Sequence, residues 1–190
     1  MTYGQIKSTI KMTKNKNSLA DKAGLPPGSL IHIGELHNEE LKLDVIDYSS
    51  DSYDSFDPTI VEDCFAYRDT KTISWINVVG LSETDKIETL GLHYGFHPLL
   101  IEDILNTQHR PKLDEFDNCV FITLKMLRIN EEDRSIQSEQ ISFVLGKTWL
   151  ITFQEKEGDV FDDFRTRLNK TKGVIRQKGA DYLMYRLIDI

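Results

Sequence analysis

The sequence predicts a mixed α/β fold of the α+β type: a three-layer α/β/α sandwich with a mixed, partly antiparallel sheet, followed by the start of a long helix. Two observations favour this fold. Residues 119–154 contain three segments that read as strands, separated by short turns, the pattern of an antiparallel meander. Apolar residues with helical spacing flank the meander near 83–105 and 159–170. The length of 190 residues suits one domain.

The N-terminal part divides into a tail and the beginning of the domain. Residues 1–22 carry five lysines and one aspartate, which predicts a flexible, lysine-rich tail. The domain is expected to span 23–178, opening with the turn sequence GLPPG at 24–28. We expect strands at 29–34, 41–48 and 73–79, and a polar loop or weak helix at 48–58.

Two short helices are expected after the strand at 73–79. Ser82-Glu83-Thr84-Asp85 resembles a capping box that begins an amphipathic helix, and Gly91 interrupts its pattern. Pro98 suits the first turn of a second helix, which we expect over Pro98–Leu105 with His97 as its cap.

The meander and two further helices complete the predicted fold. Asp159 is expected to cap a helix, and a last helix begins near Ala180. Its apolar pattern continues to Ile190, so we interpret 179–190 as the first turns of a truncated long helix in a larger protein. The meander strands are expected at 119–129, 136–145 and 148–154.

Composition argues against several classes of protein. The net charge is −8, and residues 35–63 carry ten acids and one lysine, which would repel nucleic acid. No apolar run exceeds four residues, whereas a spanning helix needs about 18. Cys64 and Cys119 lack metal-site or redox spacing and predict buried free thiols in a reducing compartment.

Enzyme signatures are absent from the sequence, so the chain is not expected to be an enzyme. It contains no phosphate-binding loop, serine-hydrolase or zinc-protease motif. His93 and His97 have the spacing of a zinc site, but Gly95 and Pro98 break the helix that would align them. Structural roles are therefore favoured for both histidines.

Three carboxylates are candidate metal ligands. Glu102 and Asp103 are adjacent in an apolar helix, where side chains point about 100° apart. Each could offer a hard oxygen to a divalent cation where another element approaches, although two solvated acids are the alternative. Asp189 is the third candidate, with the same alternative. Arg110 is expected to pair with a local carboxylate.

Eight segments in order along the chain belong to one pattern. They are GLPPGSL at 24–30, SWIN at 74–77, GFHPLLIEDILN at 95–106, RPK at 110–112, FITLKM at 121–126, SEQISFVLGK at 138–147, FQEKEGDVFD at 153–162 and ADYLMYRLID at 180–189. Together they resemble the CorA magnesium transporter family. Asp163 departs from that family, which often has proline at this position.

The resemblance implies the cytoplasmic domain of a homopentameric Mg²⁺ channel, also passing Co²⁺, of prokaryotic inner membranes. The expected partners are identical subunits and divalent cations, without nucleic acid, and the membrane is reached only through C-terminal helices outside these residues. The position of Asp103 would supply the main metal site between subunits, facing an acid on the stalk helix of the next subunit. Glu102 would pair with Asp189 in a second site. Mg²⁺ bound there would favour the closed pore.

Other functions remain open on the sequence alone. A zinc-transporting relative in the same superfamily is one, and a free-standing soluble metal-binding or partner-binding module is another. A metal-dependent hydrolase would need three or more convergent ligands, which the spacing does not offer.

Overall fold

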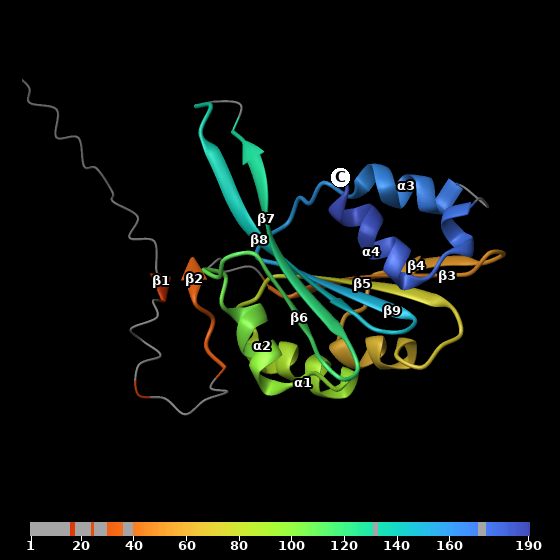
Figure 1. The fold of residues 1–190 in the computed structure, drawn as a ribbon, viewed down its shortest axis with the longest axis horizontal. Coiled ribbons are helices and arrows are strands. Elements are labelled where there is room, and N and C mark those ends of the chain that lie inside the picture. Colours follow the sequence, from red (N-terminus) through yellow and green to blue (C-terminus); the bar gives the residue numbers. More distant parts are fainter. Residues whose placement is uncertain (1–15, 18–23, 25–29, 36–39, 131–132, 171–173) are drawn as a thin grey trace, which may run out of the picture.

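A seven-stranded sheet forms the middle layer of the molecule. The computed structural model describes residues 16–17, 24, 30–35, 40–130, 133–170 and 174–190. The strands of the sheet are β3 Lys42–Tyr48, β4 Tyr53–Phe56, β5 Ile73–Val79, β6 Lys112–Glu115, β7 Val120–Ile129, β8 Ile136–Leu145 and β9 Trp149–Gln154. They lie in the order β4-β3-β5-β9-β8-β7-β6 (Figure 1).

The only parallel pair of this sheet, β5 and β9, lies at its centre. Ser74 pairs with Trp149 and Val79 with Gln154, whereas every other neighbouring pair is antiparallel. Helices cover both faces, and the two strands are buried along almost their whole length, which explains their nearly continuous apolar sequences. The predicted antiparallel meander is confirmed as β7-β8-β9.

Helices pack on both faces of the sheet, which confirms the three-layer α/β/α prediction (Figure 1). On one face Leu90 and Ile101 join a core cluster with Ile76, and on the other Phe164 and Leu183 pack in a second cluster. The first face carries the 3-10 helix η2 Val61–Tyr67, α1 Thr84–Tyr94 and α2 Pro98–Leu105. The second carries α3 Asp162–Lys170, the 3-10 helix η3 Val174–Gln177 and α4 Ala180–Ile188.

Two edge strands differ from the sequence prediction. Residues 53–56 form β4, where a loop or weak helix was expected, because they pair with the β3 strand across a tight turn. β6 was not expected and pairs with β7 at the opposite edge. Both strands are short and half-exposed, so neither carries the apolar signal that marks a buried strand.

The helix α1 also corrects two predictions. It continues through Gly91 to Tyr94, because Gly91 is where α2 packs: a Cβ at this position would lie 3.0 Å from the side chain of Ile101. The helix ends at Gly95, whose φ of +75° is the left-handed conformation of a C-terminal glycine. The expected capping box is not formed, since the N-cap is Glu83 without a side-chain cap.

The hairpin of β7 and β8 extends beyond the rest of the sheet (Figure 1). β6 pairs only with Val120–Thr123 of β7, and β9 only with Ile141–Leu145 of β8. The remaining part, from Lys125 and Gln140 outwards, is a two-stranded ribbon. Leu127, Ile129 and Ile136 on this ribbon are exposed.

Little of the expected N-terminal tail lies within the described residues. Lys16–Asn17 form β1, which pairs antiparallel with β2, Gly34–Glu35. The rest of 1–22 lies outside the described residues, as do residues 25–28 of the predicted turn. Of the strand expected at 29–34, residue 29 lies outside the described residues and only Gly34 belongs to a strand, β2. Across the described ranges, no helix is both long and apolar enough to span a membrane.

Candidate metal centre

The helix α2 fixes the direction of the two adjacent carboxylates. Pro98 begins it, and the His97 side chain accepts a hydrogen bond from the Leu99 amide at 3.2 Å, which confirms the predicted cap. The apolar face of the helix is buried against the sheet. Glu102 and Asp103 therefore lie on the opposite side of the helix, and both are half-buried.

Asp103 is held by two neighbours that the sequence analysis did not single out. Its Oδ1 lies 2.9 Å from His109 Nε2, and its Oδ2 accepts a hydrogen bond from Lys112 Nζ at 2.7 Å. Lys112 also reaches Asp114 Oδ2 at 2.8 Å. Arg110, which we expected to take a carboxylate, is in no ion pair within the described part of the chain, because the chain turns before β6 and presents Lys112 instead.

The lysine beside Asp103 is firmly charged. Burial alone would lower the pKa of Lys112, but its hydrogen bonds to Asp103 and Asp114 outweigh this effect and raise the pKa above its ordinary value. The Asp103 side chain is 18% exposed, so an approaching cation could still reach it. Such a cation would have to displace or share the carboxylate with the Lys112 ammonium.

The structure does not bring Glu102 and Asp189 together within one chain. Glu102 lies on α2, whose apolar residues join the core cluster on one face of the sheet. Asp189 is the exposed C-cap of α4, whose apolar residues join the cluster on the other face (Figure 1). The two acids are thus presented on opposite faces of the domain.

The described residues of this chain do not gather a cluster of metal ligands by themselves. Among the residues that the structure describes, no group of three or more His, Cys, Asp and Glu side chains could hold a metal ion. Mg²⁺ keeps most of its water and usually takes one or two carboxylates. Asp103, Glu102 and Asp189 each carry a carboxylate of the kind that Mg²⁺ binds, and their role as metal ligands stays a prediction.

The remaining residues with possible metal chemistry have structural roles. The His93 ring stacks on Phe65 with centroids 3.8 Å apart, and His97 caps α2, so the two imidazoles do not share a ligand position. Cys64 and Cys119 are buried free thiols, as predicted. Burial raises the pKa of the Cys64 thiol to about 12, which makes it a poor metal ligand and nucleophile.

Comparison with known proteins identifies relatives over most of the chain. The model of the family described as CorA-like Mg²⁺ transporter protein matches residues 70–190. The cobalt/magnesium transport protein CorA of Thermotoga maritima is 44% identical over 171 residues, which cover 90% of this chain and 48% of that protein. This chain therefore spans about half the length of that relative.

Solved structures share the fold. The soluble domain of CorA from Methanocaldococcus jannaschii has a TM-score of 0.56 and 16% identity, over 76% of this chain and 54% of the other. The ZntB cytoplasmic domain of Vibrio parahaemolyticus has a TM-score of 0.57 and 14% identity, over 80% of this chain and 57% of the other. These identities show the fold alone. The family match and the 44% identity show more: this chain belongs to the CorA-like Mg²⁺ transporter family, a family of transporters rather than enzymes.

Proposed function

We propose that this chain is the cytoplasmic regulatory domain of a CorA-type channel that transports Mg²⁺ and Co²⁺. The observation that carries the proposal is the 44% identity with a cobalt/magnesium transport protein over nearly the whole chain. In this proposal the domain lies on the cytoplasmic face of a prokaryotic cell membrane. It assembles with identical subunits into a homopentamer and senses intracellular Mg²⁺.

The geometry at Asp103 supports a sensor of modest affinity. A cation that binds this carboxylate must exchange with Lys112 and His109, which are already 2.7 Å and 2.9 Å away. The net binding free energy of the ion is therefore the difference between its own interaction with Asp103 and the interactions of Lys112 and His109 that it replaces. A weak site of this kind empties and fills as the cation concentration in the cell changes, which suits regulation better than permanent metal storage.

The opposite placement of Glu102 and Asp189 supports a ring of subunits. A closed ring uses two different surfaces of each subunit, one for each neighbour. Glu102 on α2 and Asp189 at the end of α4 are presented on opposite faces, so one subunit could offer Glu102 to the Asp189 of the next. Mg²⁺ between them would offset the repulsion between neighbouring domains that each carry −8 over these 190 residues.

The closed pore is favoured in this proposal because the cation binds best when neighbouring carboxylates are close together. A ligand shifts a conformational equilibrium by its differential affinity for the two states. Low intracellular Mg²⁺ would empty the sites, and the repulsion between acidic faces would then loosen the ring.

The test is the Mg²⁺ dependence of ion flux through the full-length channel that contains this domain. In proteoliposomes, Asp103→Asn should require roughly tenfold more Mg²⁺ on the cytoplasmic side for closure, the loss of about one charged ligand interaction. Asp114→Asn is the matched control, because it removes another carboxylate that contacts Lys112 but leaves Asp103 in place. Unchanged closure in Asp103→Asn would refute the sensor role.

The same vesicles separate the rival functions. Flux of Mg²⁺ and Co²⁺ that exceeds flux of Zn²⁺ supports the proposed channel, whereas preferred Zn²⁺ flux would assign the chain to a zinc transporter. If the natural coding sequence ended at residue 190, the chain would be a free-standing module and the channel proposal would fail.

A further inference from the structure

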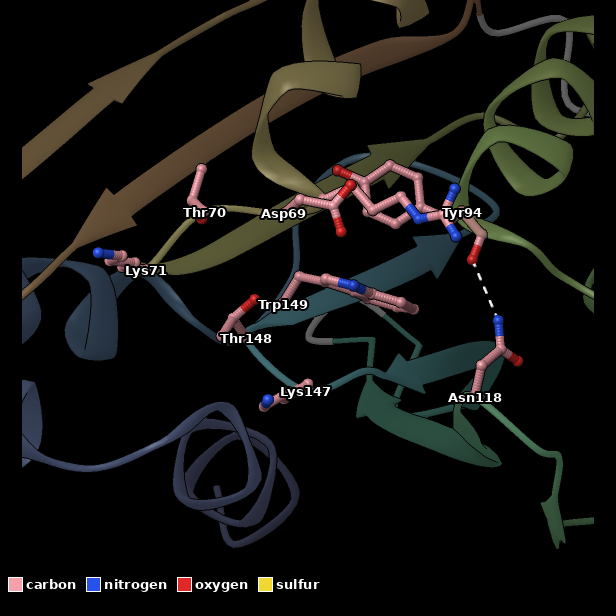
Figure 2. A pocket seen from close by; sticks show the side chains of 9 residues that line it. Asp69, Thr70, Lys71, Tyr94, Asn118, Lys147, Thr148 and Trp149 are labelled. Atoms are coloured by element: carbon pink, nitrogen blue, oxygen red, sulfur yellow. Dashed lines mark hydrogen bonds between the residues drawn. The ribbon is translucent and has the colours of Figure 1, made fainter.

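A hollow with a basic lining lies at the end of the sheet where β5 and β9 begin. Its volume is about 510 Å³, which is within the range of small-molecule sites. The parallel register of Ser74 and Trp149 brings the segments that precede the two strands to the same end of the sheet. Figure 2 shows Lys71 and Lys147, one from each segment, on the same side of this hollow. The full lining is Arg68, Asp69, Thr70, Lys71, Tyr94, Asn118, Lys147, Thr148 and Trp149.

The charge of this hollow contrasts with that of the whole chain. Three cations and one acid, Asp69, line it, although the chain carries −8. Lys71 and Lys147 form no ion pair with any described residue, whereas other cations such as Lys112 and Arg165 are bound to carboxylates. Cations that remain without a carboxylate in an acidic protein produce a local positive potential that attracts anions.

The negative end of helix α1 points into this region, yet its carbonyls are covered. Arg68 donates to the His93 carbonyl, and Asn118 Nδ2 lies 2.9 Å from the Gly95 carbonyl. The same Nδ2 lies 3.3 Å from the Tyr94 carbonyl (Figure 2). An anion in the hollow would therefore meet the Arg68 guanidinium at this wall rather than bare helix carbonyls.

The floor is formed by buried aromatic rings. Trp149 is 5% exposed and contacts Tyr94 edge to face, with ring centroids 4.9 Å apart. The Trp149 ring lies directly over Gly146, where a Cβ would come within 2.1 Å of the ring. Gly146 thus lets the indole close the bottom of the hollow between the two lysines.

We propose that this hollow binds a phosphorylated small molecule through Arg68, Lys71 and Lys147, and specifically its oligophosphate group. Three cations and one acid in the lining match a ligand with two or more negative charges. The volume exceeds that of a single phosphate, so the group is carried by inorganic pyrophosphate or by a nucleoside diphosphate or triphosphate. The site lies apart from Asp103 and contains none of the proposed metal ligands.

The proposal is tested by calorimetric titration of this chain with pyrophosphate, ADP and AMP in buffer with EDTA, so that divalent cations do not contribute. We expect saturable binding of pyrophosphate that weakens about tenfold in Lys71→Gln and again in Lys147→Gln, since each removes one close charge pair. Asp69→Asn should strengthen binding several-fold, because it removes the one opposing charge. Tighter binding of ADP than of pyrophosphate would identify the nucleotide as the source of the oligophosphate.

The matched control is the double variant Lys170→Gln/Lys178→Gln, which has the same net charge as Lys71→Gln/Lys147→Gln but changes exposed lysines outside the hollow. It should bind pyrophosphate as the unsubstituted chain does. Circular dichroism melting confirms that every variant is folded. Equal loss of binding in both double variants, or no saturable binding by the unsubstituted chain, would overturn the proposal. The proposal would also be overturned, in favour of a membrane surface, if the chain did not bind pyrophosphate but sedimented with vesicles of anionic phospholipid in a way that required Lys71 and Lys147.

Discussion

Arg165 is predicted to be the most important charged residue for the stability of the domain. Its guanidinium lies 2.6 Å from Asp159 and 3.2 Å from Asp44, and it stacks over the Trp75 ring at 4.9 Å. The Asp159 side chain is only 7% exposed. Arg165→Met keeps much of the side-chain volume but leaves this carboxylate buried without its cation. Breaking a buried pair in this way costs about 3–5 kcal/mol of unfolding free energy.

The stability lost in Arg165→Met should be smaller at acidic pH than at neutral pH. Burial alone would raise the pKa of Asp159, but hydrogen bonds from Arg165 and the Phe161 amide outweigh it and hold the pKa below its ordinary value. The stabilisation is therefore present above the unfolded pKa of about 3.9 and is lost as the pH falls through the folded pKa. In Arg165→Met, burial without the guanidinium should raise the Asp159 pKa, so protonation of this carboxyl removes the buried charge. The unfolding free energy of the variant should therefore fall furthest below that of the unsubstituted chain near pH 7, and the difference should become smaller toward pH 4.

Urea unfolding followed by tryptophan fluorescence at several pH values measures both effects. Arg167→Met is the control, because Arg167 is an exposed arginine on the same helix and its loss should change stability by less than about 0.5 kcal/mol. A deficit below about 1 kcal/mol at pH 7 in Arg165→Met, with an unchanged dependence on urea, would refute the reasoning.

Three further predictions concern the core and its turns. Phe164→Ala should lower the unfolding free energy by about 3–5 kcal/mol in the same urea assay, since the ring is fully buried; a loss below 1 kcal/mol would contradict the packing described. Gly95→Ala should cost about 1–2 kcal/mol in thermal melts, because φ is +75° and a Cβ would meet Asn118 at 2.8 Å; an unchanged melting temperature would argue against this cap. Burial raises the pKa of the Cys64 thiol to about 12 and of the Cys119 thiol to about 11, so a disulfide reagent at pH 8 should modify them only after urea is added.

The central elements could be predicted from sequence because burial leaves a strong pattern there. The strand Ile73–Val79 is buried on both faces and is apolar at all positions except Ser74 and Asn77. The helix Pro98–Leu105 begins with a proline and a side-chain cap. β4 and β6 could not be found in this way, because short edge strands have few apolar residues. Gly91 was misinterpreted as a break because its role depends on the neighbouring helix α2.

The candidate sites show the same division between local and long-range information. Glu102 and Asp103 stand out locally, as acids within an apolar helix. The contacts of Lys112 with Asp103 depend on β6, which has no clear sequence signal. Lys71 and Lys147 are far apart in sequence and lie at the same end of the sheet because β5 and β9 pair in parallel. The signal that could have indicated this second site was a Lys-Thr pair directly before each of two strands.

The outer part of the β7-β8 ribbon, which pairs with no third strand, should open more readily than the rest of the sheet. Beyond Lys125 and Gln140 each strand has one neighbour instead of two, and Leu127, Ile129 and Ile136 gain little from packing. Two-stranded ribbons are marginal in water. Backbone amides there should exchange with deuterium through small fluctuations, long before those of β5 and β9, which are released only when the whole domain unfolds.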